Sequence, residues 1–144
     1  MAELNCQIVR PDRSLFEGAV ANIILVTYAG ELGVWPGHAP EVVALGDGVV
    51  RIRRTPEDGG GEFDVVVSGG YAEVDRDGVI ILADHARRTD DIDPEVVHRT
   101  RDKAIDALDE LEPGDYRAAY YEKKVRWCNL LLKHATGGPA QGQR

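Results

Sequence analysis

The chain has 144 residues and a formal net charge of −8, which is enough length for one domain with an appendage and makes free nucleic acid a poor partner. No apolar run reaches the ~20 residues that a membrane span needs, and Met1-Ala2-Glu3 lacks the basic start of a signal peptide, so we expect no direct membrane insertion. The two cysteines, Cys6 and Cys128, lie far apart without CxxC spacing, which favours reduced thiols over a disulfide framework.

Residues 1–89 have the pattern of a β domain. Their apolar runs are rich in β-branched and aromatic residues, and residues 23–28 form the longest run. Residues 50–53 alternate apolar and basic side chains, as a strand with one wet face does. Residues 56–61 and 75–78 carry the turn residues between strands. Short strands separated by frequent turn signals predict a sandwich or a flattened barrel.

The stretch 30–40, GELGVWPGHAP, contains three glycines, two prolines and one histidine. Glycine adopts backbone conformations that other residues avoid, and proline fixes φ and removes a hydrogen-bond donor. We expect a shaped connector that buries its apolar side chains and points two polar ones outward. The apolar side chains are those of Leu32, Val34 and Trp35, and the polar ones are those of Glu31 and His38.

The pattern changes at residues 90–93, just before Pro94. Asp93 is a suitable N-cap with Pro94 at the first helical position, and a helix is predicted to about Leu111. A second helix is predicted from Tyr116 to about His134, with Asp115 as its cap. Because the link is short, the helices must form a hairpin. The predicted organisation is a sandwich at 1–89, a hairpin at 90–136 and a flexible tail at 137–144.

Each predicted helix has apolar residues at helical spacing. The stripe of the first helix consists of Val97, Ala104, Ile105, Leu108 and Leu111. The second helix has one face with Tyr121, Val125, Cys128 and Leu132, and a separate patch with Tyr120, Trp127 and Leu131.

The charges of the two helices differ. Residues 92–112 hold seven acids and three bases, whereas residues 116–134 hold one acid and five bases. One interpretation is mutual attraction within the hairpin, at ~0.2–1 kcal/mol per exposed pair. The other is a basic helix that can leave its neighbour for an acidic partner.

No catalytic constellation is present. Ser68-Gly69-Gly70 lacks the GxSxG pattern of a hydrolase serine and predicts a tight backbone passage within a sandwich. The four histidines are scattered without metal-ligand spacing, so no zinc site is expected. We therefore expect no catalytic residue, no metal and no cofactor.

Four segments together resemble a known family. Residues 30–42 (GELGVWPGHAPEV) are similar to the signature loop of the epsilon subunit of rotary proton-translocating ATP synthases. Residues 65–74 (VVVSGGYAEV) and 79–86 (VIILADHA) resemble two further segments of that family, and residues 4–18 fit its first two strands. The segments occur in order at matching spacing over nearly all of residues 1–93.

The resemblance implies an α+β fold: a β-sandwich of about ten strands followed by an antiparallel two-helix hairpin. It implies a non-catalytic central-stalk subunit of a bacterial F-type ATP synthase, which helps to couple proton flow to ATP synthesis. The sandwich would bind the gamma stalk subunit and the ring of membrane c subunits, with Glu31 and His38 at the ring contact. The protein would then be peripheral at the cytoplasmic face of the bacterial plasma membrane.

The resemblance also assigns a regulatory role to the hairpin, which in the family can extend between the catalytic subunits and inhibit ATP hydrolysis. The residues expected to contact the alpha/beta hexamer are Lys123, Lys124, Arg126 and Trp127.

Some members of the family bind ATP in the folded hairpin through an I/L-D-x-x-R-A motif. Ile92 and Asp93 match its first two positions, but Val96 and Val97 replace the Arg-Ala pair. Lysine cannot replace the bidentate phosphate contact of that arginine, so we expect weak ATP binding or none. The remaining positive charges that can face a phosphate are Lys103, Arg117 and Lys124.

One alternative from a different class is a free-standing β-sandwich binding module with a helical dimerisation arm. A hairpin that exposes Trp127 and Tyr120 can self-associate. The proteins that copurify with the chain distinguish the two hypotheses.

Overall fold

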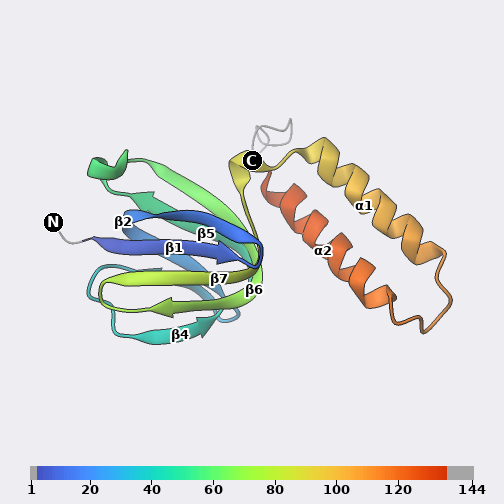
Figure 1. Ribbon diagram of the computed structural model, residues 1–144, viewed down its shortest axis with the longest axis horizontal. Helices are drawn as coiled ribbons and strands as arrows, with labels where there is room; N and C mark the ends of the chain where they lie inside the picture. Colours follow the sequence, from blue (N-terminus) through green and yellow to red (C-terminus); the bar gives the residue numbers. More distant parts are fainter. Residues whose placement is uncertain (1–2, 136–144) are drawn as a thin grey trace. The chain divides into compact units, whose positions relative to one another are not determined.

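The computed structural model describes residues 3–135, which form two compact units that meet between Arg88 and Thr89 (Figure 1). The first unit is a β-sandwich and the second is a pair of helices, as predicted. The predicted flexible tail, 137–144, lies outside the described residues.

The first unit is one seven-stranded sheet that closes on itself. Its order is β1-β7-β6-β5-β2, and β1 also pairs with β2, so these five strands form a ring to which β3 is added at β2 and β4 at β6. The β1–β7 pair is parallel and the other pairs are antiparallel. The strands are β1 (Leu4–Arg10), β2 (Arg13–Thr27), β3 (Gly30–Val34), β4 (Glu41–Ala44), β5 (Asp47–Arg54), β6 (Glu62–Val74) and β7 (Gly78–Arg88).

Two long strands explain why seven strands replace the expected ten. Strand β2 has 15 residues: its first half pairs with β1 and its second half with β5 and β3. Strand β6 has 13 residues and pairs with β5 along its first half and with β4 along its second. Strands β2 and β6 therefore each take part in both layers of the sandwich. The bend in β6 lies at Gly69 and Gly70, whose φ angles are +71° and +104°, which confirms the tight backbone passage predicted at this point.

The core lies between the two layers and follows the period-2 alternation of the strands. In β1, for example, Leu4, Cys6 and Ile8 are buried, whereas Asn5 is exposed. Burial of each large apolar side chain contributes roughly 1.5–3 kcal/mol. The largest fully buried side chains of the sandwich include Leu4, Ile8, Ile23, Leu25, Leu45, Ile52 and Ile81.

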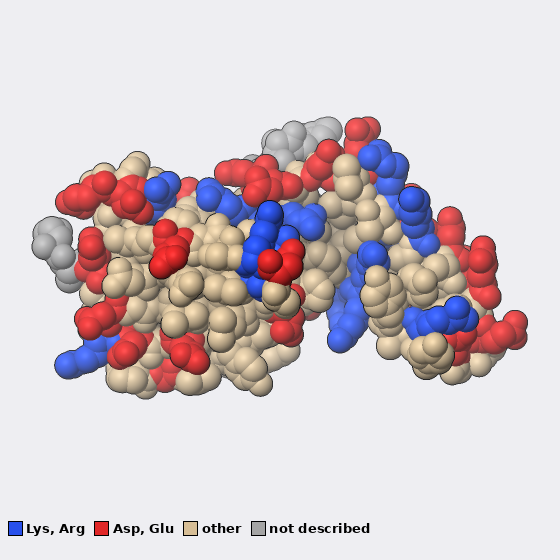
Figure 2. Space-filling model, in the orientation of Figure 1, with Lys and Arg blue, Asp and Glu red and all other residues tan. Residues whose placement is uncertain are grey.

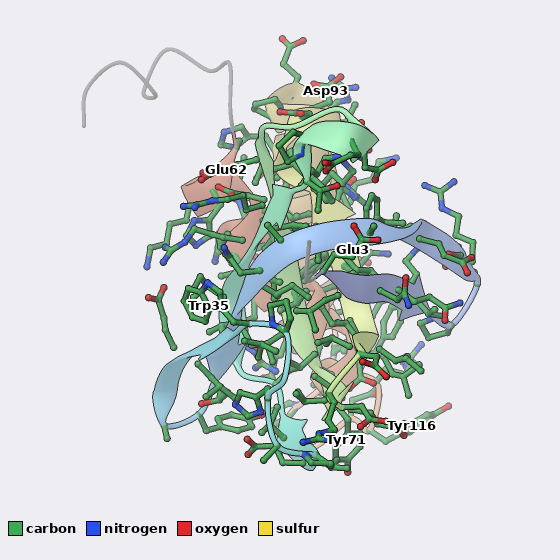
Figure 3. All side chains as sticks on the ribbon, turned by 90° about the vertical axis from the view of Figure 1, so that its left-hand side faces the viewer. Glu3, Trp35, Glu62, Tyr71, Asp93 and Tyr116 are labelled. Atoms are coloured by element: carbon green, nitrogen blue, oxygen red, sulfur yellow. The ribbon has the colours of Figure 1, made fainter. Side chains whose placement is uncertain are left out.

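The stretch 30–40 corrects one prediction. Its first half is not a connector but the edge strand β3, which pairs only with β2 because β2 is long enough to offer its outer edge. The connector begins at Trp35, whose side chain is 53% exposed rather than buried. A Cβ atom on Gly33 would collide with the Trp35 ring, so the ring packs against the glycine. Figure 3 shows Trp35 at the outside of the sandwich.

The second unit consists of η2 (Thr89–Asp91), α1 (Pro94–Asp109) and α2 (Ala118–His134), and the two long helices run side by side in opposite directions (Figure 1). Asp93 caps α1 as predicted, because its Oδ1 accepts from the backbone N–H groups of Glu95 at 3.1 Å and Val96 at 3.4 Å. Helix α2 begins two residues later than predicted, and its N-cap is Arg117, so the prediction of Asp115 as the cap is wrong. Asp115 accepts from the Arg117 N–H at 2.8 Å in the turn that precedes it.

Burial within the hairpin differs from the predicted stripes at two positions. Val97, Ala104 and Cys128 are buried as expected. Ile105, however, is 39% exposed, and Leu131, which was expected in a separate patch, is only 1% exposed. Leu131 therefore belongs to the interior of the protein and not to a free surface.

Candidate functional site

Glu31 lies on the edge strand β3, opposite Val26 of β2. Its Oε1 accepts a hydrogen bond from Arg51 Nη2 of β5 at 3.1 Å, and both side chains remain about half exposed. The carboxylate is thus held at the surface by a side chain that reaches across β2 from β5. Such a pair is easily exchanged for a partner's group, because an exposed ion pair contributes only ~0–1 kcal/mol.

His38 lies on the connector after β3 and is held by its own loop. Its backbone N–H donates to Trp35 O at 3.2 Å, and its Nδ1 lies 2.7 Å from Ala39 O. Because a carbonyl oxygen only accepts, Nδ1 carries a proton and donates. Nε2 is left to face Glu41 Oε1 at 3.7 Å.

An open hollow of about 420 Å³ lies beside Glu31 and Glu41. It is lined by residues of β3, β4, the end of β2 and the turn between β2 and β3. Glu41 faces His38, but His38 itself does not line the hollow, so only Glu31 of the two predicted ring-contact residues lies directly on it. Tyr28, at the same turn, is 80% exposed and adds an aromatic side chain to the rim.

The connector is fixed to the rest of the sandwich by its backbone. Gly37 has a φ of +89°, which favours glycine, and its N–H donates to Arg76 O in the β6–β7 turn at 2.9 Å. This hydrogen bond ties the loop that carries His38 to the β6–β7 turn, and binding residues are often found on loops that a rigid scaffold positions in this way.

A second surface is the outer strip, which we define as Val42, Tyr71, Ile80 and Leu82. These side chains lie on β4, β6 and β7 and are 66%, 58%, 38% and 41% exposed. Tyr71 is the register partner of Leu82, and Glu73, the partner of both Val42 and Ile80, lies within the same row. The strip is thus an exposed, mainly apolar area on three paired strands, interrupted by the Glu73 carboxylate.

The outer strip was missed in the sequence, although a signal existed. Residues 79–83 are apolar at every position, which is typical of a strand covered on both faces. The structure covers only the inner face, where Val79, Ile81 and Ala83 are buried.

Beside the outer strip lies a hollow of about 540 Å³. Its lining is rich in carboxylates, namely Glu17, Glu73, Asp75 and Asp77. Figure 2 shows acidic side chains around an uncharged area on this part of the sandwich. Among residues 3–135, no group of three or more His, Cys, Asp or Glu side chains has a geometry that could hold a metal ion.

The hairpin presents basic and aromatic side chains on α2. Lys123 and Arg126 are exposed, whereas Lys124 and Trp127 are partly buried. Lys124 Nζ donates to the Tyr120 hydroxyl at 3.3 Å and lies 5.4 Å from the centre of that ring. The aromatic side chains exposed on this unit are those of Tyr116 (89%) and Tyr120 (61%).

The residues named for nucleotide binding are not brought together. Asp93 precedes α1, whereas Arg117 precedes α2 at the other end of an antiparallel pair, and the 16 residues of α1 separate the two ends by ~24 Å. Ile92 is buried, Asp93 is engaged as a cap, and Lys103 and Lys124 lie on the middle turns of the two helices. The position of the motif's arginine is taken by Val96, which is 45% exposed.

Arg117 already has an anionic partner. Its Nη2 donates to Asp115 Oδ2 at 2.8 Å and its Nε donates to Asp115 Oδ1 at 3.1 Å. These hydrogen bonds lower the pKa of the Asp115 carboxyl to about 2. The guanidinium is thus paired within the interhelical turn.

Both cysteines are buried and neither is part of a disulfide bond. Burial in the sandwich raises the pKa of the Cys6 thiol to about 12, so the nucleophilic thiolate is suppressed. Within the part of the chain that the structure describes, neither helix combines the length and the apolar character that crossing a bilayer requires.

Comparison with known proteins extends over both units. The family model described as ATP synthase, Delta/Epsilon chain, beta-sandwich domain, matches residues 3–89. The ATP synthase epsilon chain of Moorella thermoacetica is 42% identical over 94% of this chain and 98% of its own length. The chloroplastic epsilon chain of Cucumis sativus is 33% identical over 92% of this chain and 90% of its own length.

A solved structure agrees with these relatives. A chain in the mitochondrial ATP synthase of Euglena gracilis, determined with its OSCP, F1 and c-ring, superimposes with a TM-score of 0.69 at 26% identity, covering 92% of this chain and 81% of that one. The sandwich, the hairpin and the relatives that span both lead to one conclusion: the chain belongs to the family of ATP synthase epsilon chains.

Proposed function

We propose that the protein is a non-catalytic subunit of the central stalk of a rotary, proton-translocating ATP synthase. The observation that carries the proposal is the match to epsilon chains over 94% of the chain, which includes the hairpin as well as the sandwich. In this role the subunit catalyses no chemical reaction itself. It transmits rotation between the ring of membrane c subunits and the alpha/beta hexamer, and so helps to couple proton flow to ATP synthesis.

The outer strip is the surface that we assign to the gamma stalk subunit. An exposed apolar area on three paired strands is unusual on a free monomer and marks a contact surface. Tyr71 is 58% exposed and Leu82 41% exposed, so both have apolar area left to bury against a partner. Tyr71 supplies the type of aromatic side chain that dominates binding energy at interfaces.

The hollow between Glu31 and Glu41 is the surface that we assign to the c ring. Glu31 and Glu41 line it, and His38 faces Glu41 from the connector, which Gly37 fixes to the sandwich. Carboxylates and an imidazole suit the polar loops of a membrane protein better than they suit its apolar segments. The subunit would then be held at the cytoplasmic face of the bacterial plasma membrane through the complex.

The hairpin is the regulatory part of the proposal. Helix α2 carries four basic residues and Arg117 precedes it, against the single acid Glu122. A basic helix is attracted to an acidic surface over about a Debye length, ~8 Å at physiological salt. Contact of Lys123, Lys124, Arg126 and Trp127 with the catalytic subunits would restrain rotation and so inhibit ATP hydrolysis.

Purification of the complex from native membranes through an affinity tag on this chain tests the proposal. We expect the gamma subunit, the c ring and the alpha/beta hexamer in stoichiometric amounts. Recovery of the chain only with itself would contradict the proposal and would support a free-standing module with a dimerisation arm.

A further inference from the structure

The two helices of the hairpin are joined by a hydrogen bond between side chains. Arg101 Nη1 of α1 donates to Asn129 Oδ1 of α2 at 3.0 Å. Arg101 lies in the row Val97, Arg101, Ala104, Leu108, whose spacing is that of one helix face. Val97 and Ala104 of this row are buried, so a guanidinium interrupts an otherwise apolar row.

The remaining contacts of the guanidinium lie on α1 itself. Arg101 Nη2 donates to His98 Nδ1 at 3.1 Å, and Nε lies 3.8 Å from Asp102 Oδ1. The Arg101 side chain is 28% exposed. When the helices separate, the contacts to His98 and Asp102 can persist because they belong to one helix, whereas the bond to Asn129 must break.

We propose that Arg101 and Asn129 form a polar latch that sets how readily the hairpin opens. A hydrogen bond with a charged donor stabilises the closed form. Asn129 is exposed and the guanidinium is partly exposed, so water replaces the bond once the helices part. A pair of leucines at these positions would instead have to expose apolar area. The latch thus holds the hairpin closed while keeping the cost of opening small. Its consequence for hydrolysis rests on the proposed function.

Hydrogen exchange of the backbone amides in the full chain tests the latch directly. An isolated helix of 17 residues is marginal in water, so the amides of α2 exchange once it separates from α1. Arg101→Met keeps the aliphatic stem but removes the donors, and we expect α2 amides to exchange about tenfold faster, the effect of a net hydrogen bond near 1.4 kcal/mol. Asn129→Asp should slow exchange, because a bond between two charged groups is stronger.

Arg99→Met is the matched control, since Arg99 lies exposed on the same helix. The amides of β6 provide the internal reference for a folded sandwich. Equal exchange rates of the α2 amides in Arg101→Met and Arg99→Met would contradict the proposed latch. Faster exchange of these amides in Asn129→Asp would also contradict it.

The assembled complex separates this inference from the function on which it rests. With an inhibitory hairpin, Arg101→Met should lower ATP hydrolysis and Asn129→Asp should raise it. Changed exchange rates with unchanged hydrolysis would uphold the latch and overturn the inhibitory role of the hairpin.

Discussion

Gly70 of β6 and Leu82 of β7 are so close that a Cβ atom on the glycine would collide with the carbonyl oxygen of Leu82. The same Cβ would lie 2.8 Å from Ala83 Cα. This contact allows β6 to bend while it stays paired with β7, and the bend brings Tyr71 to the outer surface beside Leu82. The backbone passage and the outer strip are therefore parts of one feature.

Gly70→Ala should destabilise the protein by about 3 kcal/mol or more, because it combines a φ of +104° with a collision against backbone atoms. Gly37→Ala is the control, since its φ of +89° is also unfavourable but its Cβ would meet nothing within 4 Å. We expect it to cost only about 1–2 kcal/mol. Urea unfolding of the full chain measures both, and equal losses would show that the close approach is not the cause.

Tyr71→Ser and Leu82→Ser should each weaken binding to the gamma subunit about ten- to a hundredfold, since a buried large side chain contributes roughly 1.5–3 kcal/mol. Both side chains are exposed in the free chain, so the stability of the chain should change little. Tyr116→Ser, which removes an exposed tyrosine from the hairpin, is the control. Titration of purified gamma subunit measures the affinities. Unchanged affinity in both strip variants would mean that the stalk binds elsewhere.

Cysteines placed at Glu31 or His38 should crosslink to a c subunit in the assembled complex. The control position is Glu57, in the short helix η1 (Pro56–Asp58) that follows the far end of β5. The start of β5, by contrast, lies close to Glu31: Gly46 N donates to Val26 O at 3.1 Å, and Val26 is the register partner of Glu31. Glu57 therefore lies at the opposite end of β5 from Glu31. The native thiols of Cys6 and Cys128 are buried, so they should react little with the crosslinking reagent. Crosslinks from Glu31 or His38 only to catalytic subunits would show that the sandwich is inverted.

ATP should bind the full chain with a dissociation constant weaker than micromolar, or not at all. Val96 replaces the phosphate-binding arginine of the family motif, and Arg117 is paired with Asp115 about 24 Å along the hairpin from Asp93. Isothermal titration calorimetry measures the affinity. A micromolar constant that is lost in Asp93→Ala would contradict this prediction and would mean that Lys103, Arg117 and Lys124 converge on the nucleotide.

Local patterns predicted the fold well where one physical rule dominated. Strand alternation predicted the sandwich, and the Asp93–Pro94 cap with the helical spacing of apolar residues predicted the hairpin. Trp35 was misjudged because nothing in the sequence reveals that its ring packs against Gly33 on the outside of the sandwich. The outer strip depends on which faces of β7 are covered, and the pairing of Arg101 with Asn129 depends on the register of the helices. Local patterns in one chain do not determine either.

The most direct test of the proposed role is the rate of ATP hydrolysis by the purified complex that carries either the full chain or residues 1–112. The truncation removes α2, with its basic residues and Trp127, but keeps the outer strip and the hollow at Glu31. Reversal of the charges at Lys123, Lys124 and Arg126 should act in the same direction more weakly, and added salt should mimic it in part. We predict faster hydrolysis by the truncated complex with an unchanged subunit composition. Equal hydrolysis rates, or loss of the truncated chain from the complex, would contradict a stalk subunit whose hairpin acts as an inhibitory arm.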